Sequence, residues 1–110
     1  MTPHFNLWLE KNDEVALSTW RVALLKAVAE TGSISAAAEK MNVQYRTAWQ
    51  KINEMESRLG VKLVETQVGG PRGGGATLTP AARDYLAKFD RFNADLDKVV
   101  QAKYREVFGQ

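Results

Sequence analysis

The stretch GSISAAAEKMNVQYRTAWQKINEMESRLG, which begins at Gly32, constrains the fold of this chain more than any other. It contains two segments of helical character, separated only by Asn42 and the valine after it. Asn tolerates the left-handed backbone conformation of a tight turn. The spacing therefore predicts two helices, at about 35–41 and 44–59, joined at an angle by that turn. Ser35 is the expected N-cap of the first helix, because its hydroxyl can accept hydrogen bonds from N–H groups in the first turn.

The second helix of this pair is predicted to have an apolar and a polar face. Its apolar residues recur at spacings of four, three and four, on one stripe made of Ala48, Ile52, Met55 and Leu59. Arg46 and Gln50 lie opposite this stripe and Thr47 on its flank, with no acidic residue in the first two outward turns. Arg and Gln can form bidentate hydrogen bonds to base edges, so the pattern fits a DNA recognition helix. A solvated surface helix is the alternative on polarity alone. Trp49 flanks the stripe, and we expect it to pack against the core.

The segment before this pair is predicted to form a strand or hairpin over 5–17 and a helix over about 19–31. Apolar residues recur from Phe5 at the two-residue period of a half-buried strand, and a turn-like Lys-Asn-Asp follows. Ser18 and Gly32 suit the N-cap and the C-cap of the helix. Its apolar residues at helical spacing are Trp20, Ala23, Leu24, Ala27 and Val28.

After the second helix of the pair, the chain is predicted to form a β-hairpin over 62–78 around a glycine-rich loop. Short apolar segments on each side of GGPRGGG suggest the two strands. A hairpin directly after a recognition helix is the wing of a winged helix-turn-helix, and Arg72 in its loop would contact the DNA backbone or the minor groove. A flexible loop without a ligand is the main alternative. A nucleotide phosphate loop is disfavoured, because the Gly-Lys-Ser/Thr order that opens a helix in such loops is missing.

The following residues, 80–108, are predicted to form one long helix. Thr79 and Pro80 suit its N-cap and first position, and neither Gly nor Pro interrupts the chain before Gly109. Apolar residues recur at spacings of four and three, as in a coiled-coil seam, at Tyr85, Phe89, Phe92, Leu96 and Val99. Because one small domain cannot cover so long a stripe, we expect the helix to pair with its copy in a second subunit. Packing of the whole helix on its own domain is the alternative.

Composition and charge exclude several other classes of protein. The 110 residues suit one domain, with no cysteine for a disulfide, a thiolate metal site or a thiol nucleophile. The single histidine, His4, excludes a multi-histidine metal site, and no carboxylate pair forms a catalytic motif, so we expect no enzyme, metal or cofactor. No signal-like or membrane-spanning apolar run is present, which predicts a cytoplasmic protein without membrane contact. Residues 33–79 carry six basic and four acidic groups, a surplus that suits nucleic acid.

These features together predict a mainly α fold with a small β component. Residues 1–79 would form a winged helix-turn-helix DNA-binding domain, and residues 80–108 a long dimerisation helix. The expected partner is a double-stranded DNA operator, bound by a homodimer with one recognition helix in each half-site. A protein-interaction module that keeps this fold is the alternative hypothesis.

The segment ALLKAVAETGSISAAAEKMNVQYRTAWQKINEMESRLGVKLVETQVGGPRGGGATLTPAARDYL resembles the DNA-binding domain of ModE-type, molybdate-responsive transcriptional regulators, within the broader LysR-type winged-helix group. Two motifs point to the molybdate branch. The run YRTAW, followed by INEM, is similar to that family's YKSAW and INEM, where LysR-type proteins usually have Ser-Gln-Pro-Ala. The run GGPRGGGATLT is similar to the family's glycine-rich wing, GG-x-GGGGA-x-LT. The resemblance covers nearly the whole chain.

The resemblance also implies a set of DNA contacts. They fall on the start of the first helix of the pair, on the recognition helix and on the wing, at Ser33, Ser35, Gln44, Tyr45, Arg46, Thr47, Gln50 and Arg72. Gln50 stands where the family commonly has an acidic residue, which bears on the operator sequence. Molybdate-sensing members of the family carry the oxyanion in small β-barrel domains after the long helix. Because this chain stops at Gln110, we expect either a lone DNA-binding module, with a separate effector-domain protein as a possible partner, or a LysR-type DNA-binding fragment.

Overall fold

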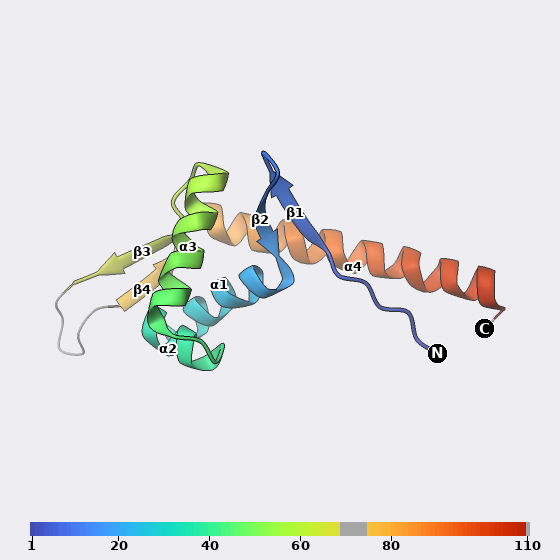
Figure 1. Ribbon diagram of the computed structural model, residues 1–110, viewed down its shortest axis with the longest axis horizontal. Coiled ribbons are helices and arrows are strands. Elements are labelled where there is room, and N and C mark those ends of the chain that lie inside the picture. The colour runs from blue at the N-terminus through green and yellow to red at the C-terminus, as the bar shows by residue number, and fades with distance from the viewer. Residues whose placement is uncertain (69–74, 110) are drawn as a thin grey trace.

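The computed structural model describes residues 1–68 and 75–109, and in these ranges it contains two short hairpins and four helices (Figure 1). The first hairpin consists of β1 (Trp8–Lys11) and β2 (Glu14–Ser18), and the second of β3 (Val64–Gln67) and β4 (Gly75–Leu78). The helices are α1 (Thr19–Thr31), α2 (Ile34–Lys40), α3 (Tyr45–Leu59) and α4 (Pro80–Phe108). This arrangement confirms the predicted fold class, mainly α with a small β component and a long C-terminal helix.

The N-terminal hairpin is tight, and it starts later than the predicted 5–17. Asn12 and Asp13 both have positive φ, 54° and 64°, as a two-residue type I′ turn requires. Pairing starts at Trp8, which faces Ser18. Since Ser18 ends β2 and also caps α1, the residues before Trp8 have no strand opposite them and lie outside the hairpin.

Helix α1 lies at the centre of the domain, where it contacts α2, α3, α4, β2 and β4. As predicted, Ser18 Oγ accepts from the Arg21 N–H over 3.1 Å, and Gly32 closes the helix in the left-handed conformation. Trp20 is exposed, although its spacing predicts a core position. Arg21 is buried instead, with 8% of its surface exposed, because its Nη2 pairs with Glu54 Oε2 of α3 at 2.8 Å.

The hydrophobic core forms where α1, α2, α3, the wing strands and the first turns of α4 meet. The stripe predicted for α3 is buried at Ala48, Ile52 and Met55, and Leu59 is half-buried at its end. The largest fully buried side chains are Leu24, Leu25, Val28, Met55 and Leu63. The core therefore holds α3 by one face and leaves the opposite face in solvent.

The helix pair predicted around Asn42 is α2 and α3, but α2 begins earlier than expected. Its N-cap is Ser33, whose Oγ accepts from the Ala36 N–H over 2.9 Å. Ser35, the predicted cap, lies within the first turn and is exposed. The cap falls before Ile34 because Ile34, as the first helical residue, is buried in the core. Asn42 turns the chain with a φ of 58°, as predicted.

Helix α4 is one uninterrupted helix of 29 residues. Thr79 Oγ accepts from a first-turn N–H, Pro80 occupies the first turn, and Gly109 ends the helix in the left-handed conformation. These are the signals from which the sequence predicts a helix over 80–108. Thr79 also ties the helix to the segment just before the second hairpin, since its hydroxyl donates to the Lys62 carbonyl oxygen over 2.7 Å.

The start of α4 packs on the domain, and the rest of the helix projects from it (Figure 1). Phe89, about ten residues into the helix, is buried with 5% of its surface exposed. The radius of gyration of the chain is 16.6 Å, compared with about 13 Å for a compact domain of this length. Along the projecting part, Gln101 Nε2 donates to the Pro3 carbonyl oxygen over 3.2 Å, so the N-terminal segment runs beside the helix.

Gly60 gives a direct test of how α3 ends. Its φ of 72° is a left-handed conformation in which a β-carbon is strained, and among the described residues no atom beyond its two chain neighbours lies within 4 Å of where that carbon would stand. We therefore expect Gly60→Ala to lower the free energy of unfolding by about 1 kcal/mol through backbone strain alone, measured by urea denaturation. Gly60→Asn is the control and should lose less, because Asn adopts this conformation more readily. Equal stability of the alanine variant and the parent would contradict this account.

Candidate nucleic-acid interface

Hydrogen bonds to the backbone fix the wing strands relative to the helices. The Ala76 N–H of β4 donates to the Gly32 carbonyl oxygen, just after α1, over 2.8 Å. The Glu56 carboxylate of α3 accepts from the N–H groups of Leu63 and Val64 over 2.8 and 3.1 Å. Strand pairing begins at Val64, two residues later than predicted, directly after this contact. The fold therefore sets the position of the wing strands beside α3 (Figure 1).

The N-terminal half of α3 presents most of its predicted contact residues to solvent. Gln44 is the N-cap residue, and its side chain makes no capping hydrogen bond. Tyr45, Arg46 and Gln50 are exposed, whereas Thr47 is half-buried. Arg46 and Gln50 lie one turn apart on the face opposite the core, as predicted. This half of the helix carries hydrogen-bond donors and acceptors of the kind that read base edges.

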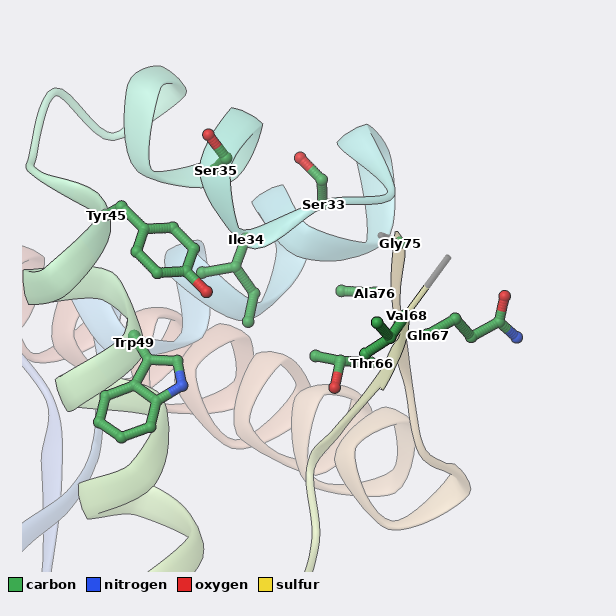
Figure 2. Close-up of a pocket in the computed structure, with 10 residues that line it drawn as sticks. All are labelled: Ser33, Ile34, Ser35, Tyr45, Trp49, Thr66, Gln67, Val68, Gly75 and Ala76. Carbon is green, nitrogen blue, oxygen red and sulfur yellow. The ribbon is translucent and has the colours of Figure 1, made fainter. Parts of the chain in front are cut away.

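A cleft of roughly 380 Å³ lies between the start of α2, the first turns of α3 and the wing strands (Figure 2). Its polar and aromatic lining comes from α2 and its cap, from α3 and from β3, in the residues Ser33, Ser35, Tyr45, Trp49, Thr66 and Gln67. The structure thus brings three of the predicted contact residues, Ser33, Ser35 and Tyr45, to one hollow. Arg72, the predicted contact of the wing loop, lies outside the described residues.

The prediction that Trp49 packs in the core is wrong. Half of this side chain is exposed (53%), because Ala48 and Ile52 fill the core face and Trp49 lies one residue further around the helix. Tyr45 stands one turn before it and is equally exposed, so the two rings follow each other along the edge of α3 that faces the wing (Figure 2). The sequence signal for this pair is the four-residue spacing of Tyr and Trp on the flank of the apolar stripe.

The two acidic residues of α3 face the protein, away from the exposed N-terminal half. Glu54 pairs with Arg21 and lies 3.6 Å from Arg58 Nη1, and the hydrogen bond from Arg21 lowers the pKa of the Glu54 carboxyl below its ordinary value. Glu56 is engaged by the N–H groups at the start of the wing. Both carboxylates therefore have cationic or N–H partners within the chain.

The predicted dimerisation seam on α4 divides between the domain core and solvent. Phe89 is buried in the core, and Tyr85 is half-buried beside it. Phe92 and Val99 are exposed on the projecting part of the helix, and Leu96 between them is half-buried. The first half of the seam thus stabilises the chain itself, and the second half has large apolar side chains in solvent.

Within residues 1–68 and 75–109, no three His, Cys, Asp or Glu side chains lie close enough together to hold a metal ion. His4 is exposed in the segment before β1. None of the helices in these ranges has the apolar length needed to cross a membrane.

Residues 20–83, more than half of the chain, match the profile of the family described as "Bacterial regulatory helix-turn-helix protein, lysR family". The matched range runs from the start of α1 to the first turn of α4. It therefore contains the helix pair, both wing strands and the cleft between them.

Two curated relatives carry molybdenum-related names or the name ModE. The chain is 40% identical over 82 residues to the molybdenum-pterin-binding protein MopB of Rhodobacter capsulatus, covering 74% of this chain and 30% of MopB. It is 41% identical over 70 residues to the DNA-binding transcriptional dual regulator ModE of Escherichia coli (strain K12), covering 64% of this chain and 27% of ModE. These relatives confirm the resemblance stated from the sequence motifs. The chain spans less than a third of the length of either relative.

Solved structures of similar fold include regulators bound to DNA. Full-length CbnR in complex with its target DNA matches with a TM-score of 0.58 and 26% identity, over 77% of this chain and 28% of CbnR. ArgP from Mycobacterium tuberculosis matches with a TM-score of 0.54 and 29% identity, over 78% of this chain and 30% of ArgP. The DNA-binding domain of CbnR in complex with DNA covers 82% of this chain and 95% of that domain, with a TM-score of 0.58 and 24% identity, which supports the fold.

Proposed function

This chain belongs to the LysR family of bacterial regulatory helix-turn-helix proteins, and on that premise we propose that it is a DNA-binding transcriptional regulator that acts as a homodimer. The observation that carries the proposal is the exposed, acid-free N-terminal half of α3, held beside the wing strands by Glu56 and Ala76. A helix presented in this way fits the major groove, where its first turns meet base edges. The name of the relative ModE, a DNA-binding transcriptional dual regulator, and the structure of CbnR with its target DNA agree with the proposed DNA-binding function.

Within this proposal the contact residues divide by their chemistry. Gln44, Arg46 and Gln50 would read base edges, because their side chains are exposed in and just before the first turns of α3 and carry amide or guanidinium donors. Hydroxyl groups would contact the sugar–phosphate backbone, which is the usual partner of Ser, Thr and Tyr in DNA complexes, from Ser33, Ser35, Tyr45 and Thr47. Arg72 would add a positive charge to the backbone contact of the wing.

The homodimer part of the proposal rests on the projecting half of α4. Phe92 and Val99 are exposed there at a spacing of seven residues, which keeps both on one side of the helix. A second copy of α4 would cover them and would place two recognition helices on one DNA duplex. We propose that Leu96 completes this contact, and that Tyr85 and Phe89 support it from within each subunit.

We also propose that the genes under control concern molybdenum, because relatives over this region carry molybdenum-related names. An oxyanion signal would then come from a sensing domain outside these 110 residues or from a separate effector-domain protein. The regulator would act in the cytoplasm, where its operator DNA lies, and no catalytic step, metal or cofactor enters the proposal.

Selection of bound genomic fragments by the purified protein tests this function. We expect enrichment of a two-fold site whose half-sites lie about one helical turn apart, with affinity that falls steeply as salt concentration rises. Light scattering on the same sample should give the mass of a dimer. A folded protein that enriches no site, even at low salt, would contradict the proposed function and would favour a protein-interaction module.

Arg46 provides the most direct test of base reading. We expect Arg46→Ala to weaken binding to the selected site by roughly 1–3 kcal/mol and to relax preference at one base pair, since a guanidinium reads guanine through two hydrogen bonds. Titration of the selected site and of single-base variants measures both effects. Arg91→Ala is the matched control, because Arg91 lies on the exposed side of α4 with 86% of its side chain in solvent. If both variants lost the same affinity on every sequence, Arg46 would contribute charge only.

A further inference from the structure

Tyr45 and Trp49 place two neutral hydrogen-bond donors in the cleft between α3 and the wing. In Figure 2 the Tyr45 hydroxyl and the Trp49 indole nitrogen both point to the side of the cleft on which Thr66 lies. Among the described residues neither group has a hydrogen-bond partner. Trp8, which is equally exposed, differs in this respect because its Nε1 donates to Glu10 Oε2 over 2.9 Å. Within residues 1–68 and 75–109, the Trp49 donor is therefore unoccupied.

The lining of the cleft restricts what that ligand can be. Among the described residues that form it, none carries a charge, and hydroxyl, amide and indole groups alternate with apolar surface. Two aromatic rings supply a broad apolar wall, and indole is a hydrogen-bond donor that cannot accept. Such a lining suits a group with acceptor oxygens next to a small apolar ring. A deoxyribose with its phosphate has this composition.

The position of the cleft points to the same ligand. It opens beside the exposed N-terminal half of α3 and is bounded on its other side by β3 and β4. A DNA strand whose bases face Arg46 would have its backbone pass between α3 and the wing. We propose that this cleft receives one phosphate and the adjoining deoxyribose of that strand, with the Trp49 N–H donating to a phosphate oxygen and the indole ring packing on the sugar. This inference rests on the proposed function, and it adds Trp49 to the DNA-contacting residues.

Neutral donors have a distinct signature in binding measurements. The dependence of affinity on salt counts the cationic groups that displace counterions from DNA, and an indole displaces none. Trp49→Phe keeps a ring and removes the donor. We therefore expect it to weaken binding about ten- to a hundredfold on every sequence, as the loss of one hydrogen bond to a charged group, without changing the salt slope. Arg46→Ala, by contrast, should change the sequence preference.

The fluorescence of a single tryptophan provides a second, independent measurement. In the Trp8→Phe/Trp20→Phe variant Trp49 is the only indole, and a mixed-sequence duplex of about 30 base pairs at about 50 mM salt should protect it from acrylamide quenching. The matched control is Trp20→Phe/Trp49→Phe, whose only indole, Trp8, should stay accessible when DNA binds.

The outcomes separate this inference from the function on which it rests. Protection of Trp49 together with an unchanged salt slope in Trp49→Phe would support the cleft as a backbone site. If the parent binds DNA while Trp49 stays open to acrylamide and Trp49→Phe binds as the parent does, the inference fails and the proposed function stands. If the folded parent binds no DNA, both fail.

Discussion

Glu54→Gln is expected to lower the free energy of unfolding by about 2–3 kcal/mol at neutral pH, because it leaves a buried guanidinium without its counter-charge. Arg21 is 8% exposed, and its two terminal nitrogens meet Glu54 Oε2 at 2.8 Å and the Lys51 carbonyl oxygen at 3.3 Å. Glutamine can still accept a hydrogen bond, but it supplies no negative charge. Urea denaturation monitored by circular dichroism measures the loss.

The pH dependence of this effect identifies its cause. The hydrogen bond from Arg21 lowers the pKa of Glu54 in the folded chain below its ordinary value of 4.5, and nearby Lys51 and Arg58 lower it further. A carboxyl with a depressed folded pKa contributes stability that is present above its unfolded pKa and is lost as the pH falls through the folded pKa. The difference between the parent and Glu54→Gln should therefore be largest at neutral pH and shrink below about pH 4.5.

Glu30→Gln is the control for Glu54→Gln, because Glu30 pairs with Lys40 on the surface, where 57% of its side chain is exposed. An exposed ion pair of this kind should contribute less than about 1 kcal/mol. Equal losses in the two variants, or a difference that does not change with pH, would show that burial of Arg21 does not depend on the charge of Glu54.

The Arg21–Glu54 pair also bears on DNA binding, since it joins α1 to the middle of α3. Arg58, one turn after Glu54, reaches Glu14 Oε2 at 3.0 Å and the Val15 carbonyl oxygen at 2.7 Å, and so joins α3 to β2. Helix α1 and strand β2 thus hold the C-terminal half of α3 through charged groups, while its N-terminal half is left in solvent. A fixed orientation of this kind is what a recognition helix needs in order to reach base edges in register.

The ends of most helices could be predicted from the sequence, because capping is local chemistry. Ser18, Gly32, Thr79 and Gly109 each act within one turn of their own position, so their residue type was enough. The start of α2 could not be settled in this way. Two serines stand on either side of Ile34, and both suit a cap. Burial of Ile34 in the core selects the earlier one, which is a tertiary effect.

The two tryptophans that were wrongly predicted to be buried share one cause. Each lies one residue away from the position of its helix that faces the core. Trp20 and Trp49 both lie beside a core stripe, and periodicity alone places such large apolar residues inside. In α1 the inward position is occupied by Arg21, because it pairs with Glu54, which lies thirty-three residues further along the chain. In α3 the neighbouring Ala48 already occupies the core position, with none of its surface exposed.

The candidate site could be predicted only in part, for a related reason. The outward face of α3 follows from helical spacing, so the positions of Arg46 and Gln50 on that face could be predicted from the sequence. The cleft joins α3 to β3 across the turn that follows Leu59, and its walls meet because Glu56 and Ala76 fix the wing strands. No local pattern relates Trp49 to Thr66.

Val99→Lys is expected to separate the proposed homodimer and thereby to reduce affinity for a two-fold operator about 10²- to 10⁴-fold, because each half-site would then bind on its own. Val99 is 63% exposed in the single chain, so the substitution should leave the folding of the subunit unchanged. Across the proposed two-fold contact it would replace an apolar group by a charge on each helix. Light scattering gives the mass, and titration of one-site and two-site duplexes gives the affinity.

Lysine is chosen because its positive charge by itself would raise the affinity for DNA, whereas the predicted result is a loss of affinity. An added cation favours DNA binding through counterion release, so a loss of affinity could not be attributed to repulsion from the phosphates. Ala94→Lys is the matched control: it adds the same charge five residues earlier, at an exposed position about 140° around α4 from Val99, and it should keep both the dimer mass and the affinity. A dimer that persists in Val99→Lys would place the contact elsewhere on the chain. The proposed homodimer would also be contradicted by a parent that is monomeric in solution and binds the two-fold site no more tightly than a one-site duplex. The projecting part of α4 would then bind a different partner.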